Sequence, residues 1–272
     1  MRKTICIGGK NNIAVNSLLY LINGLAVDKN EICAVSTKGD NGVDSWQKSF
    51  LKAANDMNID ICSIEDIYDK QNIIFLSLEY DQIIKPDNFA SKYLYNIHFS
   101  LLPKYKGMYT STIPILNGEA ETGVTLHFID KGIDTGPVIA QRKFEIGIND
   151  TARILYFKYL DNALRLFKEQ INKLRSNSID CRRQDVLGSS YYKKNSNLFK
   201  MPIDFQKSSF QIHNQIRSLI FKEFQLPLIN GKPVSASTIT DEFIGFNIFK
   251  EHDDSFIISG IDGYKIIAKK AG

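Results

Sequence analysis

Apolar and polar positions follow two alternating periods through the first half of the chain. Short continuous apolar runs are typical of buried strands, and they are separated by stretches whose apolar residues recur at helical spacing. In the first such stretch Ala14, Leu18 and Ile22 share one helical face. This strand–helix–strand order predicts a mostly parallel sheet with right-handed crossovers. The predicted strands are Thr4–Ile7, Glu31–Ser36, Asp60–Ile64 and Ile73–Leu78, and the predicted helices are Asn12–Leu25 and Asp44–Met57.

The second half of the chain changes to longer helices and then to strands joined by short turns. We expect an α/β fold, in which a Rossmann-like, mostly parallel sheet flanked by helices is followed by a small C-terminal β-rich domain. The expected division is a domain over 1–188, a linker with possible substrate contacts over 189–206, and the small domain over 207–272. The predicted elements are strands at Thr122–Ile129 and Val138–Phe144, helices from Asn149 or Asp150 to Leu174 and from Ser208 to Lys222, a turn at Asn230-Gly231, and strands at Glu242–Lys250, Ser255–Gly260 and Tyr264–Lys270.

One polar face stands out at a predicted strand end near the middle of the chain. Successive strand residues point to opposite faces, so Asn96 and His98 share one face. Pro103 then ends regular pairing, and polar groups at a strand's carboxyl edge lie where ligands bind in open α/β sheets. Farther along, Asp134 lies between two glycines in a predicted loop. An imidazole, an amide and a carboxylate suit attack by an amine on an acyl carbon, although a strand end with a satisfied histidine is the alternative.

Composition and charge narrow the class of protein only moderately. The chain has 272 residues and a net charge of +4, which suits an anionic small substrate and does not require nucleic acid. We expect a cytoplasmic protein, because neither a signal peptide nor an apolar run of membrane-spanning length is visible. None of the four cysteines has the spacing of a metal site, so we expect no metal, and Cys6, Cys33 and Cys62 are predicted to be buried thiols.

Two further segments carry weaker signals. Gly8-Gly9-Lys10 opens the first predicted helix where a phosphate could lie, but it lacks the full spacing of a dinucleotide-binding loop. A tight turn into a helix is the favoured interpretation. In the linker, Tyr191-Tyr192-Lys193-Lys194 could stack a base or hold a diphosphate, and an exposed strand between domains is the alternative.

The segment Asn96–Gly107, followed by Asn117-Gly118-Glu119, Thr122–Thr125 and Ile133–Gly136, resembles a known family. These motifs are similar to those of the formyltransferases that use N10-formyltetrahydrofolate. A weaker likeness runs from Phe210 to Val234. Among the branches, the whole chain looks most like bacterial N-formyltransferases of dTDP-linked amino-dideoxy sugars, which serve O-antigen or other surface glycan synthesis.

The resemblance implies an enzyme, a donor and a set of site residues. Asn96, His98 and Asp134 match the family's catalytic residues: His98 would act as base, Asn96 would donate to the carbonyl oxygen, and Asp134 would orient the imidazole or relay its proton. By the same resemblance the pocket of N10-formyltetrahydrofolate is lined by Phe75, Leu76, Ser77, Leu78, Tyr80, Asp130 and Lys131. Residues proposed near the sugar nucleotide are Lys10, Lys104, Tyr105, Met108, Tyr109, Thr110, Tyr192, Lys194, Arg217 and Phe221.

The acceptor expected from whole-chain likeness is dTDP-4-amino-4,6-dideoxyglucose, with the 3-amino isomer as its rival. Methionyl-tRNA formylation is the alternative function, but residues 207–272 carry eight Lys/Arg and seven Asp/Glu, whereas a tRNA-binding surface should be distinctly basic. Glycinamide ribonucleotide as acceptor is disfavoured by the extra tail domain, and a non-catalytic nucleotide-binding protein by the intact catalytic residues. The expected partners are small molecules and, from the family and the exposed edges of the β-rich tail, a second copy of the chain; we expect no nucleic acid and no membrane.

Overall fold

The computed structural model describes residues 3–272, which form two compact units. The first unit comprises the chain up to Lys106 together with Gly123–Lys143 and Tyr159–Ser190. The second comprises Gly107–Thr122, Phe144–Lys158 and Tyr191–Gly272. The long helix α4 (Ala152–Ser176) contributes residues to both. No helix among the described residues has the length and apolarity that a membrane crossing needs.

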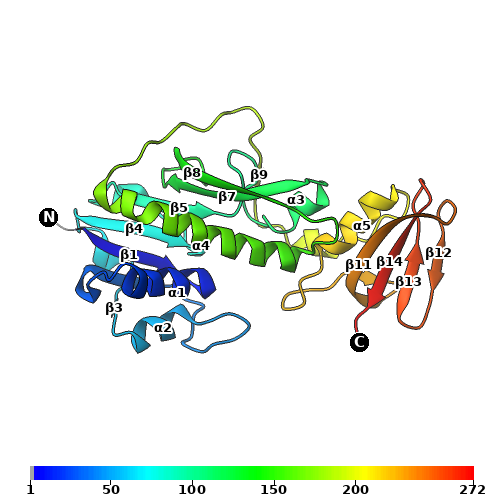
Figure 1. Ribbon diagram of the computed structural model, residues 1–272, viewed down its shortest axis with the longest axis horizontal. Helices are drawn as coiled ribbons and strands as arrows, with labels where there is room; N and C mark the ends of the chain where they lie inside the picture. Colours follow the sequence, from blue (N-terminus) through cyan, green and yellow to red (C-terminus); the bar gives the residue numbers. More distant parts are fainter. Residues whose placement is uncertain (1–2) are drawn as a thin grey trace. The chain divides into compact units, whose positions relative to one another are not determined.

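A seven-stranded sheet forms the centre of the first unit, in the order β3-β2-β1-β4-β5-β7-β8 (Figure 1). The first five strands in this order pair in parallel, and β7 pairs antiparallel with β5. The mostly parallel sheet predicted from the apolar runs is therefore confirmed. The strands are β1 (Thr4–Gly9), β2 (Ile32–Ser36), β3 (Asp60–Ile61), β4 (Ile73–Leu78), β5 (Leu94–His98), β7 (Glu121–Phe128) and β8 (Val138–Glu145).

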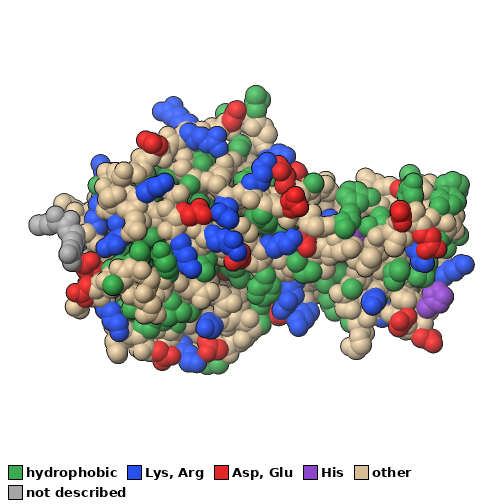
Figure 2. All heavy atoms as spheres, in the orientation of Figure 1, with side chains coloured by type: hydrophobic (Ala, Val, Ile, Leu, Met, Phe, Trp, Pro, Cys, Tyr) green, Lys and Arg blue, Asp and Glu red, His purple; other side chains and the backbone are tan. Residues whose placement is uncertain are grey.

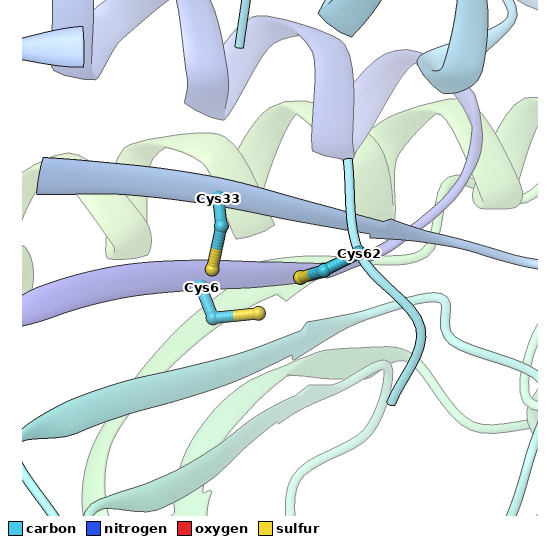
Figure 3. A group of neighbouring side chains, drawn as sticks. All are labelled: Cys6, Cys33 and Cys62. Carbon is cyan, nitrogen blue, oxygen red and sulfur yellow. The ribbon is translucent and has the colours of Figure 1, made fainter. Parts of the chain in front are cut away.

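Both faces of this sheet are covered, which explains the continuous apolar runs. Every residue of β4 is buried. Helix α1 (Asn11–Leu19) continues into a π-helical turn over Tyr20–Gly24, where the ring of Tyr20 meets Phe167 of α4 with a centroid separation of 6.3 Å. A second apolar cluster includes Cys6, Cys33, Phe75 and Leu94 and is completed by the segment that follows β3. Cys6 and Cys33 are buried as predicted, whereas Cys62 is half-buried at the edge of that cluster (Figure 3).

Several predicted elements are shorter in the structure, and local polar contacts explain why. Helix α2 begins at Phe50 (Phe50–Asp56) rather than at Asp44, because Ser49 caps it by accepting the Lys52 N–H. The Asp40 carboxylate accepts the backbone N–H groups of Phe50 and Leu51, and this holds the residues between Asp40 and Phe50 in a loop. Strand β3 ends at Ile61, since Ser63 and Asp66 bond each other's backbone N–H groups in a turn.

The second unit contains a five-stranded antiparallel sheet packed against helix α5 (Ser209–Ser218). The predicted Asn230-Gly231 turn is confirmed, with both residues at positive φ between β10 and β11. The strand predicted over Glu242–Lys250 is wrong, because Gly245 and Asn247 turn the chain with φ of 102° and 53°. The strands are β10 (Leu228–Ile229), β11 (Lys232–Phe243), β12 (Phe249–Glu251), β13 (Ser255–Ile258) and β14 (Tyr264–Lys270); α3 spans Ile113–Leu116, and β6 (Lys106–Gly107) pairs with β9 (Tyr191–Tyr192).

Candidate active site

The carboxyl end of β5 presents the first two site residues. Asn96 lies opposite Ser77 of β4 and opposite His127 of β7, and His98 lies opposite Thr125. The alternation along β5 directs the Asn96 and His98 side chains to the same side of the sheet. His98 is buried, with 8% of its surface exposed. Pairing with β4 and β7 holds the backbone of Asn96, and pairing with β7 holds the backbone of His98.

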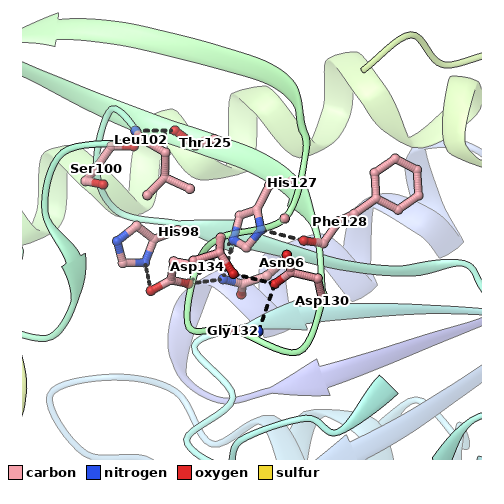
Figure 4. Close-up of polar contacts among 12 residues, drawn as sticks. Asn96, His98, Ser100, Leu102, Thr125, His127, Phe128, Asp130, Gly132 and Asp134 are labelled. Carbon is pink, nitrogen blue, oxygen red and sulfur yellow. Dashed lines mark hydrogen bonds and ion pairs between the residues drawn. The ribbon is translucent and has the colours of Figure 1, made fainter. Parts of the chain in front are cut away.

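The loop between β7 and β8 supplies the third residue. Asp134 has a left-handed backbone with φ of 54°, a conformation that Asp tolerates better than most residues. Its carboxylate Oδ2 lies 3.5 Å from Nδ1 of His98, and its Oδ1 accepts from Nδ2 of Asn96 at 3.3 Å. Figure 4 shows the three side chains converging. The structure thus brings together the three residues that the sequence predicted to be catalytic.

Main-chain contacts hold the Asp134 loop from behind. Gln184 donates from Nε2 to the carbonyl oxygens of Asp134 and Gly136, at 2.8 Å each. Gly136 approaches β7 so closely that a Cβ atom there would lie 1.8 Å from the carbonyl oxygen of Phe128. A Cβ at Gly132 would instead meet the side chain of Thr135. Gly136 is therefore required by close backbone packing, which places Asp134 over the end of β5.

A contact with a backbone carbonyl sets which ring nitrogen of His98 carries the hydrogen. Its Nε2 lies 2.8 Å from the carbonyl oxygen of Tyr105, which can only accept, so Nε2 carries the hydrogen. In the neutral ring the lone pair is then on Nδ1, the atom that faces Asp134. Burial lowers the pKa of His98, while the negative charge of Asp134 and the Tyr105 carbonyl act in the opposite direction. A neutral imidazole with a basic Nδ1 beside a carboxylate is suited to accept a proton.

A fourth side chain, His127, belongs to this network and was missed in the sequence. It is buried, and its Nδ1 lies 2.7 Å from the carbonyl oxygen of Phe128, so Nδ1 carries the hydrogen. Its Nε2 therefore accepts from Nδ2 of Asn96 at 3.1 Å, and it lies 3.5 Å from Oδ1 of Asp134. The signal that could have found it is the alternation Thr125–His127, but only the strand register reveals that His127 faces Asn96.

The loop after β5 is folded so that the Tyr105 carbonyl faces His98. Tyr105 has φ of 59°, and its N–H donates to Oγ of Ser190 at 2.8 Å. Thr125 Oγ1 donates to the Ser100 carbonyl and accepts the Leu102 N–H, which anchors the start of the loop. Tyr105 was predicted to line the sugar, but its side chain is buried, and its backbone carbonyl lies against Nε2 of His98.

The residues expected around the folate fall into two groups. Phe75, Leu76, Ser77 and Leu78 are buried in β4, so only their backbone groups at the strand end can reach a ligand. Tyr80 lines a cavity of about 170 Å³ with Ile84 and Phe89, and burial raises its pKa to about 12. Asp130 accepts hydrogen bonds from the Gly132 N–H and the Thr135 hydroxyl within the Asp134 loop. Lys131 is exposed, and its ammonium group pairs with the Asp87 carboxylate at 2.8 Å.

The residues expected near the sugar nucleotide are also divided. Lys10, half-buried at the start of α1, pairs with Asp81 at 3.6 Å, and Lys104 is exposed after β5. In the second unit Met108 donates its N–H to the Tyr192 carbonyl at 2.8 Å. This bond brings together two stretches predicted to bind the sugar nucleotide, the loop after β5 and the Tyr191–Lys194 segment. The hydroxyl of Tyr109 accepts the Asn195 N–H at 2.9 Å. Thr110 and Tyr192 are half-buried and Lys194 is exposed, so this set stays a prediction.

Two of the predicted nucleotide contacts conflict with the structure. Arg217 is 2% exposed and donates to Oδ1 of Asn214 and to the carbonyl oxygens of Gly147 and Asp150, at 2.8–2.9 Å. Burial lowers its pKa to about 10, and the nearby Asp150 opposes that effect. Phe221 is 5% exposed and packs against the ring of Tyr156. Both were proposed to contact the sugar nucleotide, but both side chains are packed inside the second unit.

The family described as "Formyl transferase" matches residues 65–178, a range that includes Asn96, His98, His127 and Asp134. A sugar 3N-formyl transferase, WlaRD, solved in the presence of dTDP and 5-N-formyl-THF, is 52% identical to this chain. That match covers 100% of this chain and 99% of WlaRD, with a TM-score of 0.97. An N-formyltransferase from Helicobacter canadensis, solved with folinic acid and dTDP-3-aminofucose, is 50% identical, with coverage of 99% and 100% and a TM-score of 0.97.

A 4-N formyltransferase from Francisella tularensis is 18% identical with a TM-score of 0.68 over 83% of this chain and 91% of that one, which shows a shared fold alone. The two relatives with half of their residues identical match along their whole length. These full-length matches and the family match indicate the same family. The clustering of Asn96, His98 and Asp134 is consistent with it. The chain is a formyl-transferring enzyme that belongs to the formyltransferase family, among the sugar N-formyltransferases.

Proposed function

We propose that this enzyme transfers the formyl group of N10-formyltetrahydrofolate to the amine of a dTDP-linked amino-dideoxy sugar. The observation that carries the proposal is full-length identity of 50% or more to two sugar N-formyltransferases, one solved with dTDP and one with a dTDP-amino sugar. The donor follows from the same relatives, which were solved with 5-N-formyl-THF or folinic acid. The catalytic network supports it, because it supplies a base and an amide donor at one point.

The base step can be derived from the tautomer of His98. When bound, the donor supplies a formyl carbon open to attack by an amine, and negative charge collects on the formyl oxygen. Nδ1 of His98 carries the lone pair and accepts the proton that the attacking amine loses. Asp134, 3.5 Å away, then stabilises the imidazolium. The formyl carbon's bond to N10 breaks, and the proton held on His98 passes to N10 as tetrahydrofolate leaves. A positioned general base of this kind typically contributes about 10²–10⁴ in rate.

The role of Asn96 follows from the two hydrogens on its Nδ2. One donates to Nε2 of His127 and the other to Oδ1 of Asp134. As His98 gains a proton, its positive charge draws the Asp134 carboxylate toward itself. The Asn96 N–H that pointed at Asp134 then becomes the donor for the formyl oxygen, a contact whose loss costs about 10²–10³ in comparable sites. Proton transfer and oxyanion stabilisation are therefore coupled through one carboxylate.

We favour a 3-amino sugar as the acceptor over the 4-amino isomer expected from the sequence. The support comes from the two half-identical relatives, of which one is a 3N-formyl transferase and the other was solved with dTDP-3-aminofucose. Lys10, Lys104, Met108, Tyr109, Thr110, Tyr192 and Lys194 remain the proposed sugar-nucleotide contacts. Lysines suit the diphosphate, and tyrosine rings suit stacking.

We also propose a homodimer and a role in surface glycan synthesis, such as O-antigen. The exposed edges of the antiparallel sheet in the second unit favour the dimer, since unpaired strand edges invite pairing. Methionyl-tRNA as acceptor is disfavoured, because residues 207–272 carry eight Lys/Arg and seven Asp/Glu, whereas a tRNA-binding surface should be distinctly basic. On the face shown in Figure 2, acidic side chains lie among the basic ones.

The test is a formyl-transfer assay with purified enzyme and N10-formyltetrahydrofolate. Three acceptors are compared at equal concentration: a dTDP-3-amino sugar, its 4-amino isomer and methionyl-tRNA. We expect the 3-amino sugar to have the highest kcat/KM, and His98→Ala to lose about 10²–10⁴ in turnover while its circular dichroism spectrum stays unchanged. Transfer to methionyl-tRNA alone would overturn the proposal.

A further inference from the structure

Three cysteines that lie far apart in the sequence meet on one side of the large sheet (Figure 3). Cys6 of β1 and Cys33 of β2 are paired neighbours in the parallel ladder. Cys62 follows β3 directly, and its N–H donates to the carbonyl of Ala34, which continues the same register. All three sulfur atoms lie within 4.8 Å of one another. The sequence spacing gave no sign of this, because the cluster is built across three strands rather than within one loop.

The surroundings of the three thiols favour metal binding by sulfur alone. Their packed neighbours are apolar and include Val35, Ile64, Ile67 and Phe75, which offer no oxygen or nitrogen side-chain ligand. Soft thiolate ligands of this kind select soft d¹⁰ ions. Cys6 and Cys33 are buried, whereas Cys62 is half-buried and opens the cluster toward solvent. A solvated ion can therefore reach the sulfur of Cys62 first.

We propose that Cys6, Cys33 and Cys62 form a three-thiolate site for a zinc-class d¹⁰ divalent cation. On binding, each thiol releases its proton to solvent and its sulfur donates a lone pair to the ion, so no oxidant or reductant is needed. Among the residues the structure describes, the cluster contains no fourth His, Cys, Asp or Glu ligand. The fourth position of a tetrahedral ion is then left to water on the Cys62 side.

Charge and size both select the ion. Three thiolates and a divalent cation leave one net negative charge. Lys70 acts favourably on Cys33 and Cys62, whereas Asp66 opposes it at Cys62, so the cluster tolerates little further negative charge. A monovalent ion would leave two negative charges in an apolar cluster, at a much higher desolvation cost. A tetrahedral ion with Zn–S bonds of about 2.3 Å needs sulfur atoms about 3.8 Å apart. Because the sulfur atoms lie within 4.8 Å of one another, the triangle reaches that size by contracting by at most about 1 Å.

The site is separate from Asn96, His98 and Asp134, although Phe75 of the predicted folate pocket packs in the same apolar cluster. The cysteines lie on β1, on β2 and directly after β3, whereas the catalytic residues lie on β5, on β7 and in the loop after β7. Metal binding would tie three neighbouring strands together and stabilise the folded state by mass action. We therefore expect metal binding to raise Tm. We expect the metal-free and the metal-bound enzyme to transfer formyl groups at the same rate.

The test uses Cd²⁺ as an optical probe of thiolate ligation. Reduced enzyme is stripped with a chelator and titrated with CdCl₂, and the sulfur-to-cadmium charge-transfer absorbance and the released protons are measured. We expect one Cd²⁺ per chain, about three protons released near neutral pH, displacement by Zn²⁺, and a Tm rise of about 5 °C at 100-fold excess over Kd.

Matched variants separate this cluster from other thiols. Cys62→Ser replaces the half-buried member and should fold, and we expect it to lose the absorbance; Cys33→Ala tests a second member. Cys181→Ser is the control, because Cys181 is exposed and lies outside the cluster. The proposal is overturned if folded Cys62→Ser and Cys33→Ala bind Cd²⁺ like the wild type, or if Cys181→Ser alone abolishes binding.

Discussion

Replacing His127 by leucine tests whether this second imidazole controls the orientation of the Asn96 amide. In the structure Nε2 of His127 accepts one hydrogen of Asn96 Nδ2, and the remaining hydrogen points at Asp134. This arrangement fixes which end of the amide faces the reacting formyl group. Leucine removes the acceptor without adding a charge, so the amide can rotate and present its oxygen instead of its N–H.

The expected effect on turnover follows from that one hydrogen bond. A neutral hydrogen bond contributes about 1 kcal/mol, and about 1.4 kcal/mol corresponds to a factor of ten. We therefore expect kcat of His127→Leu to fall about fivefold, with little change in KM for the sugar. The fall should stay far below the roughly 10²–10³ expected for Asn96→Ala, because the amide itself is still present.

Steady-state kinetics with His127→Gln as the matched variant isolates this effect. Glutamine and leucine both lose the hydrogen bond from the ring Nδ1 to the Phe128 carbonyl, but only glutamine keeps an acceptor for Asn96. We expect His127→Gln to lie within about twofold of wild-type kcat, with similar Tm values for the two variants. Equal kcat values for the two variants, or no loss in His127→Leu, would refute the orienting role.

Three further predictions concern the loop, the base and the second unit. Gly136→Ala should abolish activity, because its Cβ would clash with the Phe128 backbone. Gly132→Ala should keep most of the activity, because its Cβ meets only the side chain of Thr135, which can rotate. Comparing kcat of the two variants with that of the wild type tests the difference. Asp134→Asn removes the charge that raises the pKa of His98, so the acid limb of kcat/KM should move to lower pH in whatever activity remains; an unmoved limb would contradict this. Burial lowers the pKa of His213 to about 4, so the folded state disfavours the proton that the unfolded chain binds below pH 6.5. Stability should fall by up to about 3 kcal/mol between pH 6.5 and 4, and urea midpoints of His213→Gln should show a smaller fall.

Much of the first unit could be predicted from the sequence because its signals are local. Continuous apolar runs identified the buried strands, and the alternation at Asn96 and His98 identified their shared face. His127 could not be found in this way, since its role depends on the register between β5 and β7. Arg217 was misassigned for a related reason: a resemblance assigns a role to a position but does not show whether the side chain meets solvent or, as here, buried backbone carbonyls.

The backbone, rather than other side chains, sets the proton positions in this site. A carbonyl oxygen fixes the hydrogen on Nε2 of His98, and another fixes it on Nδ1 of His127. The two rings therefore present lone pairs from opposite nitrogens, one toward Asp134 and one toward Asn96. Because a carbonyl cannot donate, neither ring can exchange its tautomer without breaking a backbone contact. The free ring nitrogen of His98 is thus held toward Asp134 and that of His127 toward Asn96, and the left-handed backbone of Tyr105 supplies the carbonyl that sets the first of these orientations.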